Sequence, residues 1–389
     1  MTMNEHMLAQ PILVVIWIMI MVGLHIAAIP FAIKDWRPRI MVITMILNAI
    51  FMSALFQKFG YTRILGLSHV VFWTPLLAYL WKSRKSHPER IWTGRFVKLA
   101  MVIIFASLLI DYSDVIRYVL GDRGIVGGVM LTEKVNFNGA LGDVLSGKVD
   151  FPEGGVTKSW VLFAHGFSIG KDLKPIRTIS RTLVEDGYGM MRFDFTGLGE
   201  SEGDFSDTNF STNCEDIRQA ALFMAESYGA PCILIGHSFG GTASLKVADE
   251  IPQVKAVSTI GSPCDTTHIL HQFADKIQEI EQEGEAKVSL AGRPFVIKEQ
   301  FIDDVENQDI AMEISSLERG LLIFHSPQDR VVSIDNASHI YGLAKHPKSF
   351  VSLDGADHLL LKNPADAEYV AHVLKAWALR YIADCGQMA

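Results

Sequence analysis

The chain has 389 residues, of which 49% are hydrophobic, and its formal net charge is −8. This length allows two or three domains, and the acidic charge argues against a nucleic-acid partner, which would require a basic face. The hydrophobic excess lies before about residue 120. This asymmetry favours a membrane segment followed by a water-soluble domain.

Four apolar runs in the first part of the chain are candidate membrane spans, since a helix needs about 20 apolar residues to cross a bilayer. They lie near 12–33, 40–56, 64–81 and 96–112. Aromatic residues typical of membrane interfaces flank them, namely Trp36, Tyr61, Trp81 and Trp92. A cleaved signal peptide is disfavoured because the first run has no basic leader and three more runs follow it.

Basic residues in the connections predict the orientation of these spans. The first connection carries three Lys or Arg residues and the third carries five, whereas the N-terminal tail carries none. We therefore expect these two connections on the cytoplasmic side of a bacterial inner membrane. The fourth run is weaker, with Lys98 near one end and Asp111 at the other. If it spans, which we favour, the rest of the chain is periplasmic; if it lies along the interface, the rest stays cytoplasmic.

A glycine-rich segment, 121–130, is interpreted as a linker to a domain at 131–384, where short apolar runs alternate with helical patterns. The strand-like runs are 134–139, 145–152, 159–166, 187–195, 231–238, 254–263, 320–327 and 348–355. Such alternation predicts a mostly parallel sheet of eight strands with helices on both faces. Residues 268–314 interrupt it and are mostly charged and helical, with a possible hairpin at 287–297. We interpret this insertion as a lid over the carboxyl ends of the strands, or as a surface excursion.

A G-x-S-x-G motif occurs where an apolar run meets a helical pattern. It consists of Gly236, His237, Ser238, Phe239 and Gly240. The small residues allow a strand and a helix to meet at a sharp turn that exposes the serine. The motif therefore predicts Ser238 as a nucleophile on an elbow.

A serine hydroxyl needs a base, which in this arrangement follows late in the chain after an acid. Asp329 and His358 each follow a strand-like run and complete the expected order. Asp354 and Asp357 compete as the acid, but they lie too close to His358 in sequence. The remaining candidate bases fit less well: His237, His325, His339, His346 and His372.

The negative oxygen of a tetrahedral intermediate requires N–H donors aimed at it in advance. We expect these from the backbone of Phe239 and of Phe167, with His165 shaping the loop around Phe167. The glycine-rich loop at 193–204 lacks the residues of a phosphate cradle or a dinucleotide site, and is interpreted as a turn that supports the site. None of the four cysteines forms a C-x-x-C pair, so no metal or cofactor is predicted.

These motifs together resemble the α/β-hydrolase superfamily, and more narrowly the hydrolase half of bacterial fusions between an α/β-hydrolase and an osmotically inducible protein C. The segments that carry the narrower resemblance are 165–183, 191–213, 234–241, 292–305 and 346–360. The resemblance implies the family's fold and a triad of Ser238, Asp329 and His358. Gly166 and Ile169 stand where many relatives carry cysteines. Because the chain stops soon after Ile382, the fusion's peroxidase activity is not expected.

Three functions remain in competition. The first is a membrane-anchored serine hydrolase that cleaves acyl esters or thioesters, including lipid-like ones, without a cofactor. The second is an aminopeptidase-like enzyme with the same triad, which would need an acidic group for the substrate amine. The third is a non-catalytic membrane scaffold. Labelling of Ser238 separates the third from the others, and the substrate separates the first two.

Overall fold

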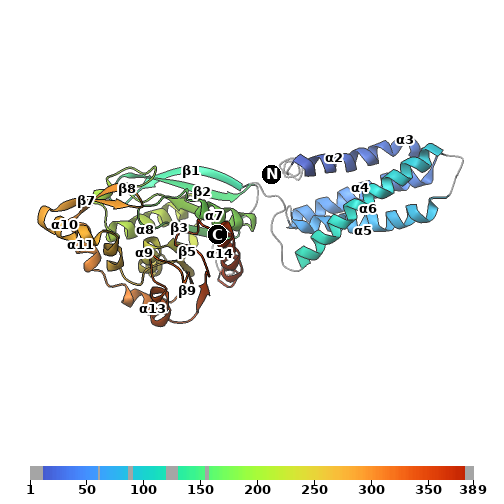
Figure 1. Cartoon of the computed structure of the whole chain (residues 1–389). Coiled ribbons are helices and arrows are strands. Elements are labelled where there is room, and N and C mark those ends of the chain that lie inside the picture. The colour runs from blue at the N-terminus through green and yellow to red at the C-terminus, as the bar shows by residue number, and fades with distance from the viewer. Residues whose placement is uncertain (1–11, 60–61, 86–90, 120–129, 154–156, 382–389) are drawn as a thin grey trace. The chain divides into compact units, whose positions relative to one another are not determined.

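The computed structural model describes residues 12–59, 62–85, 91–119, 130–153 and 157–381. The chain forms two compact units with a boundary between Val129 and Met130: a helical unit, then a unit of strands and helices (Figure 1). The expected linker at 121–130 lies outside the described residues except for Met130, which begins β1.

The first unit is a bundle of helices. Its elements are α2 (Ile12–Ala27), α3 (Ile29–Ala32), α4 (Trp36–Phe59), the 3-10 turn η1 (Arg63–Leu65), α5 (Gly66–Ser83) and α6 (Ile91–Val119). By length and composition, four segments of the described chain can cross a membrane: Leu13–Ala32, Trp36–Phe59, Arg63–Ser83 and Ile91–Val119. The second and fourth extend beyond the apolar runs near 40–56 and 96–112, because polar residues at both ends continue the helix.

The bundle has a small core and an apolar exterior. Met41, Leu80 and Ile104 are fully buried between the helices, whereas Leu13 and Val102 are 77% and 67% exposed. A water-soluble bundle would place polar side chains at such outward positions. The apolar exterior is therefore compatible with anchoring in a membrane.

The second unit contains an eight-stranded sheet in the order β1-β2-β4-β3-β5-β6-β9-β10. The strands are β1 (Met130–Asn138), β2 (Val144–Pro152), β3 (Trp160–Ala164), β4 (Gly189–Phe193), β5 (Pro231–His237), β6 (Ala256–Ile260), β9 (Gly320–His325) and β10 (Lys348–Ser352). In this sheet β2 pairs antiparallel with β1 and with β4, and the other pairs are parallel. The mostly parallel sheet expected from the alternating pattern is confirmed.

Helices cover both faces of the sheet, and each face has its own apolar core. One core joins the sheet to α7 (Lys174–Glu185) and α14 (Pro364–Ala378). The other joins it to α8 (Phe210–Ser227), α9 (Phe239–Val247) and α13 (Asp335–Leu343). Burial on both faces explains why the central strands read as continuous apolar runs.

The insertion lies between β6 and β9. It contains η4 (Thr267–Lys276), α10 (Ile277–Glu283), β7 (Glu285–Leu290), β8 (Arg293–Lys298), α11 (Glu299–Glu306) and α12 (Ala311–Ser316). Its hairpin, β7–β8, turns at Ala291 and Gly292, whose φ angles are +50° and +77°. Two successive positive φ values suit the twist of a two-residue hairpin, so the chain reverses tightly there.

Candidate active site

The strand β5 ends at a sharp turn that carries Ser238 into helix α9. Ser238 has φ 51° and ψ −126°, which a non-glycine residue adopts only when its surroundings enforce it. A Cβ at Gly236 would lie 2.3 Å from the Cα of Gly241, and one at Gly240 would lie 2.2 Å from the carbonyl oxygen of His165. These glycines therefore allow the strand, the helix and the neighbouring loop to approach one another.

The structure brings Ser238, Asp329 and His358 together from three separate loops. The Ser238 Oγ lies 3.0 Å from His358 Nε2, and His358 Nδ1 lies 2.7 Å from Asp329 Oδ2. Both distances are hydrogen bonds, with the hydroxyl donating to the ring and the ring donating to the carboxylate. The three groups form a continuous chain from a hydroxyl to a base to an acid.

Among the described residues, Asp329 is the carboxylate that accepts a hydrogen bond from the His358 ring. Burial raises the pKa of Asp329, but the hydrogen bond and charge of His358 and the backbone N–H groups of Val331 and Val332 outweigh it, and the net pKa is lowered. The competing carboxylates face elsewhere, since Asp354 accepts from Ser352 and Asp357 accepts from the backbone N–H of Lys362.

His237 hydrogen-bonds the backbone of the catalytic base candidate, His358. Its Nε2 donates to the backbone carbonyl of His358 at 2.8 Å, and the two rings lie 4.9 Å apart. Burial, followed by the proximity of His358, lowers the pKa of His237 to about 3. The side chain is therefore neutral near pH 7 and holds the backbone of His358 by a hydrogen bond.

We call residues 165–169, which follow β3, the oxyanion loop. Among the described residues, no backbone hydrogen bond of a turn, loop or cap uses the N–H of Phe167 or of Phe239. Phe239 begins α9, where N–H groups have no partner in the helix. A Cβ at Gly166 would lie 3.0 Å from Ser238 Cβ, so the loop passes directly over the nucleophile. The two donors expected from the sequence thus belong to segments that meet at Ser238.

His165 fixes the peptide that carries the Phe167 N–H. Its Nδ1 donates to the carbonyl of Gly166 at 2.9 Å, and that carbonyl shares a planar trans peptide with the N–H of Phe167. Holding the oxygen therefore aims the N–H in the opposite direction. Burial lowers the pKa of His165, which keeps the ring neutral, with one nitrogen free to accept from the Phe195 N–H at 3.4 Å.

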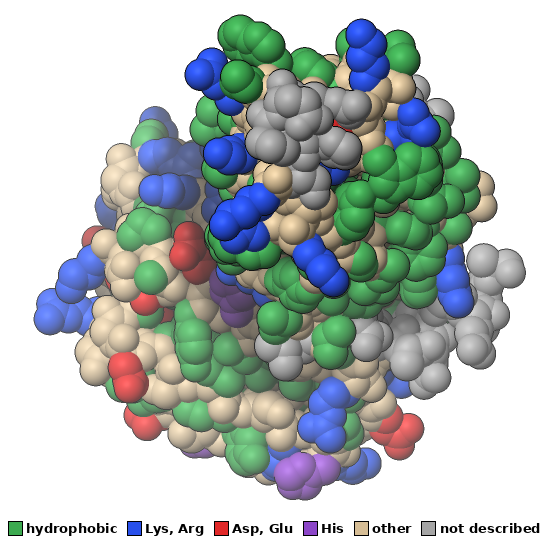
Figure 2. Space-filling view, turned by 90° about the vertical axis from the view of Figure 1, so that its right-hand side faces the viewer, with side chains coloured by type: hydrophobic (Ala, Val, Ile, Leu, Met, Phe, Trp, Pro, Cys, Tyr) green, Lys and Arg blue, Asp and Glu red, His purple; other side chains and the backbone are tan. Residues whose placement is uncertain are grey.

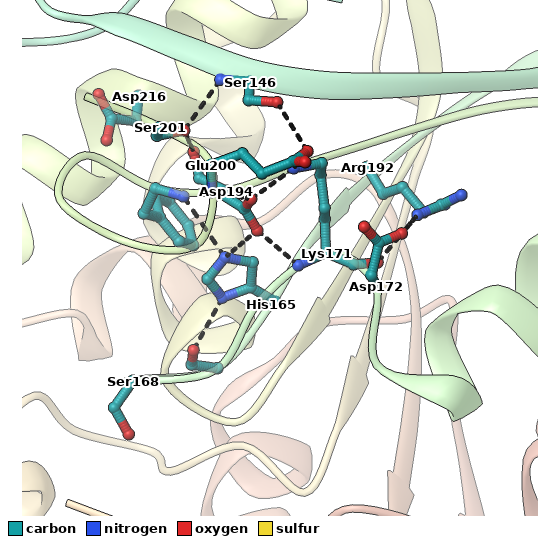
Figure 3. Close-up of polar contacts among 12 residues, drawn as sticks. Ser146, His165, Ser168, Lys171, Asp172, Arg192, Asp194, Glu200, Ser201 and Asp216 are labelled. Carbon is teal, nitrogen blue, oxygen red and sulfur yellow. Dashed lines mark hydrogen bonds and ion pairs between the residues drawn. The ribbon is translucent and has the colours of Figure 1, made fainter. Parts of the chain in front are cut away.

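A buried ion pair ties Lys171, two residues beyond the oxyanion loop, to the glycine-rich loop after β4 (Figure 3). Asp194 accepts from Lys171 Nζ at 2.5 Å and from the backbone N–H groups of Lys171 and Glu200 at 2.7 and 2.9 Å. Lys171 also bonds Glu200 at 2.9 Å. A Cβ at Gly199 would meet the Asp194 carboxylate at 2.1 Å, which explains the glycine there. Sequence reasoning missed this network, because nothing local marks Lys171 and Asp194 as partners.

The insertion supplies an aromatic wall beside the oxyanion loop. Phe301 lies 5.5 Å from Phe167 and 6.4 Å from Phe239, measured between ring centroids. Phe295 lies 4.6 Å from Phe205, which in turn lies 5.4 Å from Phe167. The side chains of both expected oxyanion donors therefore pack against the insertion. Among the described residues, no group of three or more His, Cys, Asp or Glu side chains is arranged to hold a metal ion.

Part of the chain is similar to known proteins. The family described as serine aminopeptidase, S33, matches residues 155–289. Palmitoyl-protein thioesterase ABHD10, mitochondrial, is 28% identical in Rattus norvegicus over 33% of this chain and 41% of its own length. The Mus musculus protein is 25% identical, and the match covers 59% of it. The chain thus spans about half the length of the curated relatives it matches.

Among solved structures, the esterase domain of a Rhodothermus marinus protein is 44% identical, with a TM-score of 0.54, over 65% of this chain and all of that one. Est1E from Butyrivibrio proteoclasticus, solved with ferulic acid, is 21% identical over 64% of this chain and all of its own, with a TM-score of 0.53, and shows the fold alone. The sheet order, the elbow and the relatives agree. The chain belongs to the α/β-hydrolase superfamily and is a hydrolase.

Proposed function

We propose that the chain is a membrane-anchored serine hydrolase that cleaves an acyl ester or thioester through an acyl-enzyme. The observation that carries the proposal is the unbroken hydrogen-bonded chain from Ser238 through His358 to Asp329, with the nucleophile held in a strained backbone conformation. Backbone strain at a serine and a hydrogen-bonded histidine–carboxylate pair beside it are features of functional sites and are not expected for a serine that only forms a turn.

The proposed reaction uses protein groups and water. His358 takes the proton of Ser238 as its oxygen attacks the acyl carbonyl, and it later gives that proton to the leaving group. Asp329 holds the imidazole in the required tautomer and stabilises its positive charge. The backbone N–H groups of Phe167 and Phe239 stabilise the oxyanion. Water then attacks the acyl carbon while His358 takes one of its protons. His358 gives that proton to Ser238 Oγ as the bond to the acyl group breaks and the acid leaves.

Two findings favour an acyl substrate over an aminoacyl one. The esterase domain at 44% identity and the palmitoyl-protein thioesterases act, by their names, on esters and thioesters. Phe295, Phe301 and the cation Arg293 of the insertion make ring contacts and a hydrogen bond with the oxyanion loop and its aromatic neighbours. An aminopeptidase would need an acidic group there for the substrate amine. The narrower resemblance to the osmotically inducible fusion proteins stays a prediction.

The aminopeptidase is the second candidate, because it gives its name to the matching family. Carboxylates of the insertion are the candidates for an amine site. Glu313 bonds Lys246, Asp304 bonds Ser211, and Glu279 bonds Lys276, so these three are already engaged.

Covalent labelling tests the nucleophile. A fluorophosphonate probe should label the wild type and leave Ser238→Ala unlabelled, whereas Ser316→Ala, an exposed serine on the insertion, should label as the wild type does. Equal labelling of wild type and Ser238→Ala would exclude the assignment, and absence of labelling in a folded wild type would support the scaffold.

Substrate assays then separate the two enzymes. We expect hydrolysis of short-chain and long-chain p-nitrophenyl esters and acyl thioesters to exceed hydrolysis of aminoacyl-p-nitroanilides, with both lost in Ser238→Ala. Faster cleavage of the anilides would reverse the proposed substrate class.

A further inference from the structure

The tip of the β7–β8 hairpin reaches the oxyanion loop from outside the main sheet. Arg293 is the first residue after the hairpin turn, and its Nη2 donates to the backbone carbonyl of Ser168, 125 residues earlier in the chain. Its guanidinium also lies 5.4 Å from the ring centroid of Phe295 on the same hairpin. Phe295 packs on Phe205, so the contact belongs to a packed interface.

Ser168 has a strained backbone and a buried carbonyl. Its φ is +58°, in the left-handed region that is unfavourable for a non-glycine residue, and it is 2% exposed. No backbone N–H of the described chain donates to its carbonyl. A buried carbonyl without a donor is unfavourable, so the Arg293 bond both satisfies this oxygen and stabilises the strained backbone.

The strained residue adjoins an oxyanion donor. Ser168 directly follows Phe167. The peptide before Phe167, which carries its N–H, is held by the hydrogen bond from His165 to the Gly166 carbonyl. A rotation of the Ser168 backbone would be passed to the Phe167 N–H through the Phe167–Ser168 peptide and the Cα of Phe167. Phe301 packs against the side chain of Phe167 as well. The oxyanion loop is thus held by His165 within the main domain and by Arg293 and Phe301 of the insertion.

We propose that Arg293 is a positioning residue that keeps the oxyanion loop in its catalytic conformation, so that the oxyanion hole is complete only while the hairpin is seated. The inference rests on the proposed serine hydrolase function. It gives the insertion a part in stabilising the transition state, although Arg293 itself touches no reacting atom.

Steady-state kinetics of the full chain in detergent micelles tests the role. Complete removal of an oxyanion donor costs about 10²–10³-fold in kcat, and a displaced donor should cost less. We expect Arg293→Ala to lower kcat about tenfold on a p-nitrophenyl ester, with KM changed less than twofold. Lys287→Met is the matched control, since Lys287 is an exposed cation on the same hairpin, and it should leave both constants unchanged.

Chemical rescue distinguishes positioning from folding. Added guanidinium ion at millimolar concentration should raise kcat of Arg293→Ala but not that of the wild type, and Arg293→Lys should retain part of the activity. An arylboronic acid, which mimics the tetrahedral intermediate, should bind Arg293→Ala more weakly in proportion to the loss in kcat.

The outcomes separate this inference from the proposed function. If fluorophosphonate labels wild type and Arg293→Ala at the same rate, Arg293 has no positioning role and the hydrolase assignment stands. If Arg293→Ala raises KM alone, Arg293 binds substrate instead. If the wild type is not labelled at all, the hydrolase assignment itself fails.

Discussion

At the nucleophile, close packing and backbone strain act together. Gly236 and Gly240 let β5, α9 and the oxyanion loop approach within distances that exclude a Cβ, and Ser238 takes the strained conformation between them. The local sequence is sufficient to predict this turn, because the steric demand falls on residues that are neighbours in the chain. The local sequence does not predict where His358 lies relative to this turn, because that position depends on where β9 and β10 lie in the sheet relative to β5.

Three buried histidines around the site carry lowered pKa values. Burial is the largest cause for His165, His237 and His325 alike. A neutral buried histidine must lose its proton on folding at acidic pH, whereas the unfolded chain keeps that proton. These side chains therefore make the folded domain less stable as the pH falls through 6.5.

For His237 the pH window follows from its pKa of about 3, compared with 6.5 when unfolded. Its contribution is fully present above pH 6.5 and decreases toward pH 3, by about 1.4 kcal/mol per pH unit. We expect His237→Gln, which keeps an N–H donor for the His358 carbonyl, to unfold with a shallower pH dependence between pH 6 and 4.5. Urea unfolding followed by tryptophan fluorescence measures this, and equal slopes in both proteins would contradict it.

At the scale of the helices, polar side chains of α6 bond residues of α5 and of the turn before it. Asp111 on α6 accepts from His69 Nδ1 at 3.0 Å and from Ser107 Oγ at 3.2 Å, and Asp114 pairs with Arg63 at 2.9 Å. The sequence placed Asp111 at the end of the fourth apolar run, where it weakened the evidence for a span. In the structure α6 continues past it along the start of α5.

A double-mutant cycle tests this helix pair. His69→Phe leaves the Asp111 carboxylate without its ring donor in an apolar bundle, and we expect a loss of about 1–3 kcal/mol in the free energy of unfolding. The pair His69→Phe with Asp111→Leu should recover part of that loss. Unfolding in mixed micelles of increasing SDS content provides the measurement.

The control uses the same two helices. Thr74 and Tyr112 share a 3.1 Å hydrogen bond on the exposed side of the pair, so Thr74→Val with Tyr112→Phe should show a smaller coupling energy. Additive effects for His69 and Asp111 would mean that their contact does not stabilise the bundle.

On the scale of the whole molecule, the distribution of charge bears on which side of the membrane the hydrolase unit faces. Lys34, Arg39, Lys82, Arg84 and Arg95 lie where α4 and α6 begin and α5 ends, and basic side chains stand among apolar ones at this end of the bundle (Figure 2). Because α6 starts at this end and reaches η1 at the other, the chain leaves the bundle opposite the basic end. From the positive-inside rule we propose, as an untested expectation of the sequence, a periplasmic hydrolase unit in a bacterial inner membrane.

Reporter fusions test this orientation. We expect alkaline phosphatase fused after Ala389 to be active and green fluorescent protein at the same position to be dark, because each reporter matures on one side of the membrane. Fusions after Lys85, in the third connection, should show the reverse. A fluorescent C-terminal fusion would place the hydrolase unit in the cytoplasm instead.

The sequence alone was sufficient for features encoded by neighbouring residues. The apolar runs, the order of strands and helices, the hairpin of the insertion and the elbow at Ser238 follow from periodicity and local sterics, which act over a few residues. Asp329 and His358 were accessible as candidates, because each follows a strand whose carboxyl end lies at the edge where ligands bind.

Only the tertiary structure decided which distant groups meet. It selected Asp329 over Asp354 and Asp357, placed His237 behind His358, paired Lys171 with Asp194, and brought Arg293 to Ser168. It also carried α6 past Asp111 beside α5. Such contacts join residues that are tens of positions apart, and they depend on how whole elements stack, which no local pattern records.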